Sequence, residues 1–388
     1  MFIWSYGWWL EKERAWFVDG MTNTLFCVDL NTEECEKVVG IPNVEKHIYC
    51  QNPYCAKLDR DIYCIPGQGK SIWIYNLDQK DFTELEIDEP KNHAPGSQFW
   101  IWGGRMFVVI ANWNKLIEIS VKERRITNYY TICASDSVRR SVLVDNKIYA
   151  ISYKTGAIYQ FDLVRNEVKT YLHPDMGKKF FSICYDGEKF WLCGYKREVY
   201  VWNKENDILI TINFPKDFEI YDVGSKMKEP EKESKAPLFG QTVAMGKYIW
   251  FIPTVAEKII YIDKETSVLS VFNIYEDDKA FSQKCPNIAN YLLQYIRDDR
   301  YIGLFSARNS RIIEIDTMQL EYQWKGYYFN EQYLQQYCET CKGIYDEGKD
   351  LQYIYTYHMS RLATGCKVNI ADTVGRKIYT KLIEESTK

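Results

Sequence analysis

The chain has 388 residues, of which 46% are hydrophobic and 26% charged, and its formal net charge is −4. This composition excludes a disordered chain and disfavours a nucleic-acid binder, which would carry an excess of basic residues. No apolar run approaches the ~20 residues that a membrane-spanning helix needs, so membrane insertion is not expected.

A two-part pattern recurs seven times along the chain. An apolar run containing an aromatic residue, such as Ile148-Tyr149-Ala150, is followed by a second apolar run that closes on Asp, Asn or Ser. Successive closing residues are 47, 44, 42, 41, 60 and 53 positions apart. A period of this length is typical of radial arrays of β-sheets. The closing residues are Asp29, Asn76, Ser120, Asp162, Asn203, Asp263 and Asp316.

Each repeat is predicted to form four strands. In the fourth repeat these lie at 141–144, 148–151, 158–162 and 167–171, with a tight turn at Asp145-Asn146-Lys147. The segments are short and rich in β-branched and aromatic residues, which is typical of strands joined by hairpins. Such sheets must pack face to face to bury their apolar sides. We therefore predict an all-β, seven-bladed β-propeller of four-stranded antiparallel blades, with a six-bladed ring as the alternative.

The two ends of the array are also predicted. Residues 2–10 are typical of the first strand of the first blade, and residues 319–324 of the last strand of the seventh. Each blade should then come from one contiguous stretch, and the propeller should occupy residues 1–326. The strand pattern stops after Trp324, and residues 327–388 are expected to form a small helical extension.

The blade pattern resembles the β-propeller superfamily over residues 2–324. The sequence lacks the signature of any one propeller family. Only Gly103-Gly104 matches the Gly-Gly pair of kelch blades, and no repeat closes on the Trp-Asp of WD blades. The ending Gly375-Arg376-Lys377-Ile378-Tyr379 is similar to endings of proteins from bacterial surface-polysaccharide and glycosyltransferase gene clusters. These resemblances imply a propeller in a bacterial cell-envelope context.

The amino terminus and the cysteines favour a cytoplasmic location. Met1 leads directly into a strand segment, without the basic stretch and small-residue cleavage site of a signal peptide. Cys27, Cys64, Cys184 and Cys193 lie inside apolar strand segments, where small buried thiols in a reducing compartment are expected. A disulfide scaffold is the alternative.

A ligand site is predicted at the mouth of the axial channel. The residues nine positions before each second-strand aromatic include the polar set Gln98, Arg140, Ser182 and Gln241. Lys154 and Arg197, in loops between second and third strands, are expected on the surrounding rim, where a positive field would attract an anionic ligand. The alternative is a water-filled polar channel.

Trp113, between Asn112 and Asn114, is a second candidate ligand residue. Aromatic rings stack on sugars, and amides reach their hydroxyls. Packing on a neighbouring blade is the alternative for this side chain.

Catalytic and metal signatures are few. His47, His93 and His173 all fall in links between blades, where three histidines could hold a metal or supply a general base. Cys338-x-x-Cys341 with His358 and Cys366 has zinc-ligand residue types at irregular spacing. Neither set carries a metal or cofactor prediction.

Three classes of function remain. We favour a non-enzymatic binding or scaffolding propeller that recognises a protein partner or an oligosaccharide. The alternatives are a propeller lyase or hydrolase acting on an anionic saccharide, and a sensor subunit whose tail docks onto an enzyme.

Overall fold

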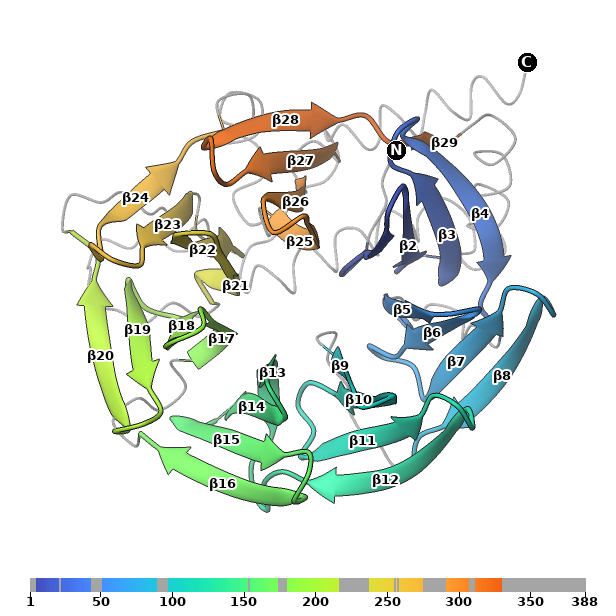
Figure 1. Cartoon of the computed structure of the whole chain (residues 1–388), viewed down its shortest axis with the longest axis horizontal. Helices are drawn as coiled ribbons and strands as arrows, with labels where there is room; N and C mark the ends of the chain where they lie inside the picture. The colour runs from blue at the N-terminus through green and yellow to red at the C-terminus, as the bar shows by residue number, and fades with distance from the viewer. Residues whose placement is uncertain are drawn as a thin grey trace, which may run out of the picture.

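The chain forms seven sheets arranged around a central axis (Figure 1). The computed structural model describes residues 5–20, 22–42, 51–88, 97–152, 154–173, 180–215, 237–254, 256, 258–274, 291–306 and 311–329. Six sheets have four antiparallel strands, and the first sheet has a fifth strand at its outer edge. The protein is an all-β, seven-bladed propeller, and the six-bladed alternative is wrong.

The four antiparallel strands of each blade come from one contiguous stretch of chain, with the first strand nearest the axis. Blade one departs from the expected contiguity, because its fifth strand comes from the far end of the described chain. Blade one is β1 (Trp9–Glu11), β2 (Arg14–Asp19), β3 (Thr24–Asp29) and β4 (Glu34–Gly40). Blade two is β5 (Tyr54–Leu58), β6 (Asp61–Ile65), β7 (Ser71–Asn76) and β8 (Asp81–Glu86). Blade three is β9 (Gln98–Trp102), β10 (Arg105–Val109), β11 (Lys115–Ser120) and β12 (Arg125–Thr131).

The remaining four blades follow the same order. Blade four is β13 (Val138–Val144), β14 (Lys147–Ser152), β15 (Ala157–Asp162) and β16 (Glu167–Leu172). Blade five is β17 (Phe180–Tyr185), β18 (Phe190–Gly194), β19 (Glu198–Asn203) and β20 (Ile208–Asn213). Blade six is β21 (Phe239–Met245), β22 (Tyr248–Pro253), β23 (Ile259–Asp263) and β24 (Leu269–Phe272). Blade seven is β25 (Tyr291–Arg297), β26 (Tyr301–Ser306), β27 (Arg311–Asp316) and β28 (Glu321–Lys325).

The closing residue of each repeat caps the turn between the third and fourth strands. In blade one, Asp29 Oδ1 accepts the backbone N–H groups of Asn31 and Thr32, both at 2.9 Å. The closing side chains of the other six blades accept N–H groups two or three residues on in the same way. Asp, Asn and Ser recur here because a short polar side chain can hydrogen-bond the backbone of its own turn.

The same turns share a left-handed residue four positions after the closing residue. These residues have φ between 49° and 63° in all seven blades. They are Glu33, Lys80, Arg124, Asn166, Asp207, Ser267 and Leu320. The turn capped by the closing side chain imposes this conformation even on Leu320, which would not adopt it by preference.

The core lies between adjacent blades. The predicted equivalent aromatics Tyr63, Phe107, Tyr149, Trp191 and Trp250 are all buried. Each is paired with the residue two before the closing residue of its blade, as in Tyr149 with Gln160. This shared register confirms the predicted alignment of the repeats.

The ring closes where blade seven meets blade one. β29 (Tyr328–Phe329) pairs in parallel with the outer edge of β4, and the backbone N–H of Gly326 donates to Glu33 Oε2 at 2.7 Å. On the inner side, the backbone N–H of Trp8 donates to the carbonyl of Gln294 at 2.6 Å. The first strand, predicted at residues 2–10, therefore begins at Trp9, because the backbone of Trp8 is hydrogen-bonded to blade seven.

The predicted helical extension falls almost wholly outside the described residues. Its first part, Tyr328–Phe329, is a strand, because it completes the edge of blade one. Among the described residues, no helix is long and apolar enough to cross a membrane.

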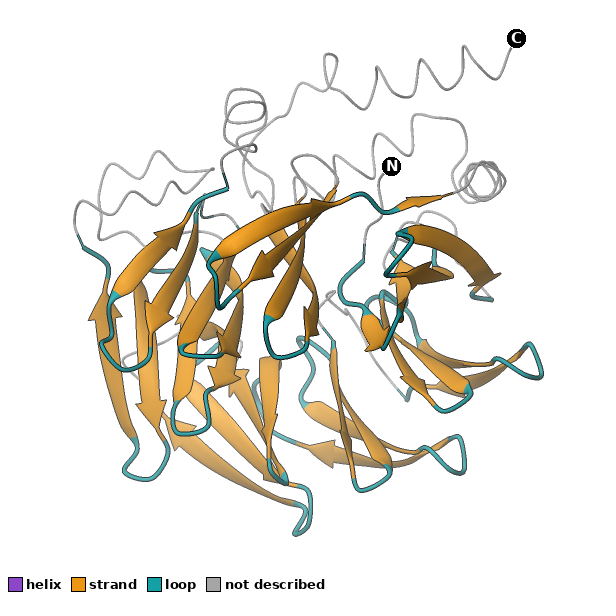
Figure 2. Ribbon diagram, turned by 45° about the horizontal axis from the view of Figure 1, so that its top comes forward, coloured by secondary structure: helices purple, strands orange, loops and turns teal. Residues whose placement is uncertain are grey.

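Two faces of the disc are distinguished below. The turn face carries the turns from first to second and from third to fourth strands, which lie on one side in Figure 2. The link face carries the loops from second to third strands and the links between blades.

Candidate functional site

The predicted mouth residues Gln98 and Gln241 join neighbouring blades. Gln98 Oε1 accepts the backbone N–H of Ser141 at 2.5 Å, from blade three to blade four. Gln241 Oε1 accepts the backbone N–H of Leu293 at 2.8 Å, from blade six to blade seven. Their carbonyl oxygens are thus occupied by the scaffold.

Ser182 and Arg140 lie in the inner strands as expected but differ in exposure. Ser182 is buried in β17. Arg140 is half-buried in β13, and its side chain forms no hydrogen bond or ion pair with any described residue. Of the four predicted mouth residues, Arg140 has the side chain best suited to an external ligand.

A β-bulge places a second arginine beside Arg140. The pairing of β13 with β14 shifts between Val138 and Ser141, so that Arg139 and Arg140 together face a single residue of β14. Bulges bend a strand and redirect its side chains. The prediction that places Arg140 nine residues before Tyr149 assumes regular strand pairing and therefore does not include Arg139.

Arg139 is held across the mouth between blades three and five. Its Nη1 donates to Asn112 Oδ1 at 3.2 Å, and its Cζ lies 4.5 Å from the ring centre of Phe181. Tyr195 meets Phe181 edge-on at 6.0 Å. The guanidinium is therefore fixed by an amide on one side and an aromatic face on the other.

Trp113 packs against its own blade. Its ring is half-buried and lies edge-on to Tyr129 at 6.1 Å, with Lys115 Nζ 5.7 Å from its centre. The two flanking amides are also engaged, because Asn112 binds Arg139 and Asn114 Nδ2 donates to the carbonyl of Cys133 at 3.1 Å. This turn holds the link that leads into β13.

Asp136 anchors the link before β13. Its carboxylate accepts hydrogen bonds from Thr155 Oγ1 at 3.1 Å, Tyr159 OH at 3.0 Å and Ser152 Oγ. Burial tends to raise the pKa of Asp136, but these bonds and the Ser137 N–H outweigh it, so the pKa lies below its ordinary value. The anchor fixes the loop that carries the exposed Lys154.

We expect Asp136→Ala to lower the free energy of unfolding by ~1–3 kcal/mol at pH 7, because it leaves three hydroxyl donors without their acceptor. Because the folded pKa is lowered, this stabilisation is present above the unfolded pKa of about 3.9 and is lost as the pH falls through the folded pKa. Urea unfolding of both proteins at pH 7 and near pH 3 measures the difference. An equal difference at both pH values would refute the role of the carboxylate.

Of the three histidines in the links between blades, the structure describes only His173. His173 packs edge-on against Phe180 and Trp202, and its Nε2 lies 3.5 Å from Asp207 Oδ1. Burial lowers the pKa of His173 despite this carboxylate. His47 and His93 lie outside the described residues, as do the CxxC residues Cys338 and Cys341, so both hypotheses stay predictions. No group of three His, Cys, Asp or Glu residues in the described ranges is placed to hold a metal ion.

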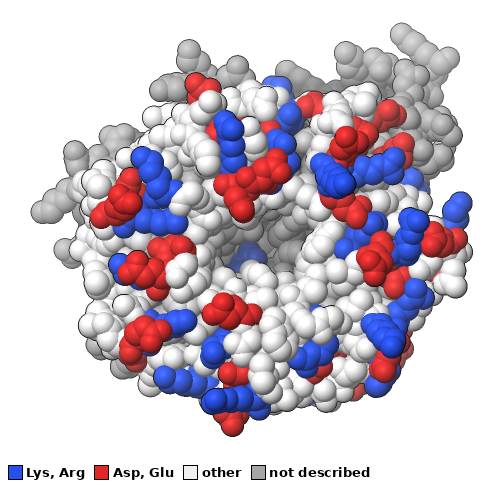
Figure 3. All heavy atoms as spheres, in the orientation of Figure 1, with Lys and Arg blue, Asp and Glu red and all other residues white. Residues whose placement is uncertain are grey.

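The predicted rim residues lie on the link face, and the turn face carries charges of both signs. Lys154 is exposed on the link face and Arg197 is half-buried there. On the turn face, Figure 3 shows Lys and Arg next to Asp and Glu around the whole rim. Ion pairs such as Arg124 with Asp61 and Arg300 with Asp316 account for part of this mixture.

Comparison with known proteins supports the fold. No protein-family model and no curated protein matches the chain. Among solved structures, the selenomethionine-substituted virginiamycin B lyase from Staphylococcus aureus superposes with a TM-score of 0.57 at 13% identity, over 79% of this chain and 92% of the lyase.

Two further solved structures are similar to the chain. PorZ, from Porphyromonas gingivalis, matches with a TM-score of 0.55 at 12% identity over 84% of this chain, which spans 38% of PorZ. The computationally designed Ika8 protein matches with a TM-score of 0.52 at 8% identity, over 84% of this chain and 87% of Ika8. At these identities the likeness is one of fold alone. The seven sheets of the chain itself define its class, the seven-bladed β-propeller.

Proposed function

We propose that this propeller is a non-enzymatic binding or scaffolding protein that holds an anionic group of a protein partner or an oligosaccharide. The proposed site is the axial mouth on the link face, at blades three to five. The observation that carries it is Arg140, a half-buried arginine without a described partner, placed by a bulge directly beside the fixed Arg139.

The chemistry of arginine supports an anionic ligand. A guanidinium offers its N–H groups in a planar fork that matches both oxygens of a carboxylate or phosphate. Arg139 is already oriented by Asn112 and Phe181, so less freedom is lost when a ligand binds. The exposed Lys154 adds positive charge nearby.

The scaffold around the mouth supports binding by a rigid surface. Gln98 and Gln241 tie inner strands of neighbouring blades, and Asp136 holds the link that enters β13. A mouth built in this way keeps its shape between free and bound states, which favours recognition over catalysis by moving parts.

A role in bacterial cell-surface polysaccharide metabolism, carried out from the cytoplasm, is part of the proposal. PorZ is described as an essential bacterial surface component of the type-IX secretion system, and it shares the propeller fold. The resemblance of residues 375–379 to endings from surface-polysaccharide gene clusters supports the same context. Neither comparison supplies a ligand.

The proposal is tested by screening the purified protein on arrays of acidic oligosaccharides and acidic peptides, beside the Arg140→Ala variant. We expect retention of an anionic compound by the wild type and loss of that signal in the variant. Arg125→Ala is the matched control, because Arg125 is an exposed arginine on the turn face, paired only with Glu123 among the described residues. A signal that Arg125→Ala removes equally would reject the mouth as the site.

A further inference from the structure

The third strand of two blades carries a buried carboxylate, two residues before the closing residue. Glu118 in blade three is 5% exposed, and Glu314 in blade seven is 2% exposed. Both face the gap toward the next blade. A carboxylate is costly to bury unless charged and polar donors surround it.

Both carboxylates are surrounded in the same way. Glu118 accepts from Arg105 Nη1 at 3.0 Å, Asn128 Nδ2 at 3.0 Å and Tyr130 OH at 2.5 Å. Glu314 likewise accepts from an arginine, an amide and a tyrosine, at distances of 2.8 to 2.9 Å. The gap beside each blade is thereby closed by an internal ion pair.

Blade four keeps the surrounding groups but lacks the carboxylate. Gln160 takes the position of Glu118, and its Oε1 accepts from Tyr171 OH at 3.2 Å, as Glu118 accepts from Tyr130. Lys169 pairs with Gln160 where Asn128 pairs with Glu118, and Lys147 starts β14 where Arg105 starts β10. Blade four has thus gained a cation and lost the internal anion.

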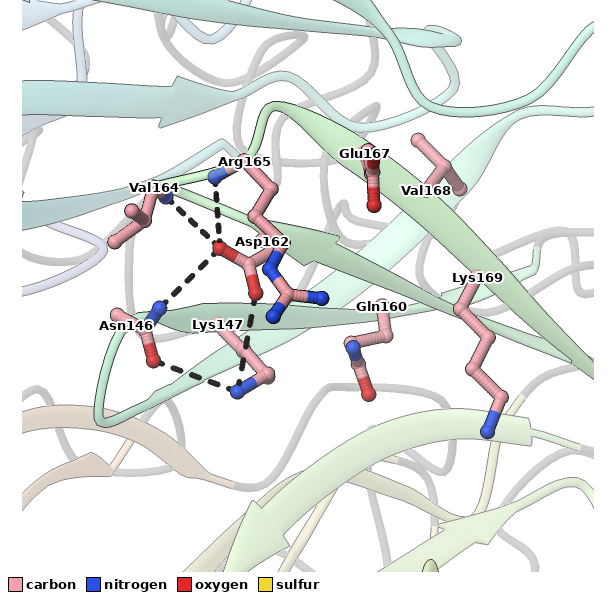
Figure 4. Close-up of a pocket in the computed structure, with 9 residues that line it drawn as sticks. All are labelled: Asn146, Lys147, Gln160, Asp162, Val164, Arg165, Glu167, Val168 and Lys169. Atoms are coloured by element: carbon pink, nitrogen blue, oxygen red, sulfur yellow. Dashed lines mark hydrogen bonds and ion pairs between the residues drawn. The ribbon is translucent and has the colours of Figure 1, made fainter.

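A pocket of about 500 Å³ opens at this place, on the turn face. Figure 4 shows Arg165, Lys147 and the amide of Gln160 turned toward the same space, with Lys169 at its edge. Arg165 and Lys169 form no ion pair with any described residue, although Lys169 Nζ lies 4.3 Å from the ring centre of Tyr171.

Two acids also line the pocket without filling the role of Glu118. Asp162 Oδ1 already accepts from the backbone N–H groups of Val164 and Arg165 and from Asn146 Nδ2, and its Oδ2 lies 3.9 Å from Lys147 Nζ. Glu167 is exposed. The charges of Asp207 and Glu205 in blade five also act on Lys169, but neither forms an ion pair with it. The guanidinium of Arg165 and the ammonium of Lys169 therefore still favour an external anion.

The strand that borders the pocket is an exposed sheet edge. β16 is the outermost strand of blade four, and no described strand pairs with its outer side. Val164 is 62% exposed beside it, and Val168 on the strand is exposed as well. At the equivalent edge of blade one, the chain itself adds β29 to β4. Outer blade edges of this protein therefore do accept an extended segment.

We infer that the pocket of blade four binds a carboxylate from an extended acidic segment of a protein partner. The segment pairs with β16 and packs on Val164 and Val168, while its Asp or Glu side chain enters the pocket beside Lys169 and supplies the negative charge that Glu118 and Glu314 supply in their own blades. This site lies on the opposite face from the proposed mouth and does not depend on it.

The test uses a labelled heptapeptide of alternating Thr and Val with Glu at its centre, and the same peptide with Gln there. Fluorescence anisotropy should show the Glu peptide binding at least about tenfold more tightly than the Gln peptide. Gln160→Glu should weaken the Glu peptide by a similar factor, because it restores the internal carboxylate of blades three and seven.

Matched variants separate this site from general charge effects. Gln79→Glu makes the same chemical change at an exposed position of a blade-two turn and should leave binding unchanged. Lys169→Ala alters an exposed side chain and should weaken binding of the Glu peptide. It is the second test variant, for the case in which Gln160→Glu does not fold. Arg140→Ala should have no effect.

Several outcomes would overturn the inference. They are no binding of the Glu peptide by the wild type, equal binding of both peptides, or equal losses in Gln160→Glu and Gln79→Glu. Full displacement of the Glu peptide by glucuronate, with glucuronate binding as tightly as the peptide, would also overturn it. The pocket would then be a saccharide site that makes no use of the strand edge.

Discussion

Replacing Trp191 with alanine is expected to lower the free energy of unfolding by ~3–5 kcal/mol, the range for truncating a large aromatic in a core. Trp191 is 2% exposed and packs between blades five and six. Its Nε1 donates to Asp186 Oδ2 at 2.7 Å, so the truncation also removes a partner of a half-buried carboxylate. Urea unfolding followed by circular dichroism measures the change.

Trp102→Ala is the control for this prediction. Trp102 is half-buried near the turn of blade three, where Arg105 lies 5.1 Å from its ring. We expect it to cost less than half as much as Trp191→Ala. Equal losses in the two variants would mean that Trp191 does not occupy the blade interface.

Glu314→Ala is expected to have an effect of comparable size, toward ~3 kcal/mol, because removing one partner of a buried ion pair leaves the others without compensation. Tyr295 and Gln323 would lose their bonds to this carboxylate, and Arg297 would keep, among the described residues, only Asp298 as an ionic partner, at 3.4 Å. Arg297 keeps some access to water at 32% side-chain exposure, which places the expected loss at the lower end of the range for buried pairs.

The position of Glu314 makes this variant a test of ring closure. Glu314 lies 3.8 Å from Lys325 Nζ, and Lys325 also lies 3.6 Å from Glu33 of blade one. Glu321→Ala, an exposed carboxylate of the adjacent strand, should be nearly neutral. Thermal melts that shift equally in both variants would contradict the role of Glu314 in the seam.

The blade array could be predicted because its signals are local. The closing Asp, Asn or Ser of each repeat caps its own turn, and the buried aromatic lies on the adjacent second strand, where apolar residues recur within a few positions. Tyr149 and Asp162, for example, need no knowledge of distant residues to be placed correctly.

The mouth was harder to predict because its geometry depends on contacts between blades. The inner strands β13, β17, β21 and β25 each contain a register shift. Counting a fixed number of residues back from the second-strand aromatic cannot detect such a shift. Arg139 was missed for this reason. Gln98 and Gln241 bind backbone groups 43 and 52 residues away in sequence, and no local pattern marks such partners.

The pocket of blade four carried a signal that alignment of the repeats could have found. Gln160 stands where two other repeats have Glu118 and Glu314. Comparing equivalent positions of the repeats shows that blade four lacks their internal carboxylate. The sequence of the turn and of the outer strand then places Arg165, Lys147 and Lys169 around this position.

Titration of the anionic compound selected on the arrays against the wild type and Arg140→Ala tests the central proposal most directly. Isothermal calorimetry should show a loss of ~1.5–3 kcal/mol in binding free energy, the range for a hydrogen bond to a charged group, with an unchanged thermal melt. Arg140→Lys should recover only part of the loss, because an ammonium cannot form the planar two-bond contact. Unchanged affinity in Arg140→Ala would contradict the proposed site.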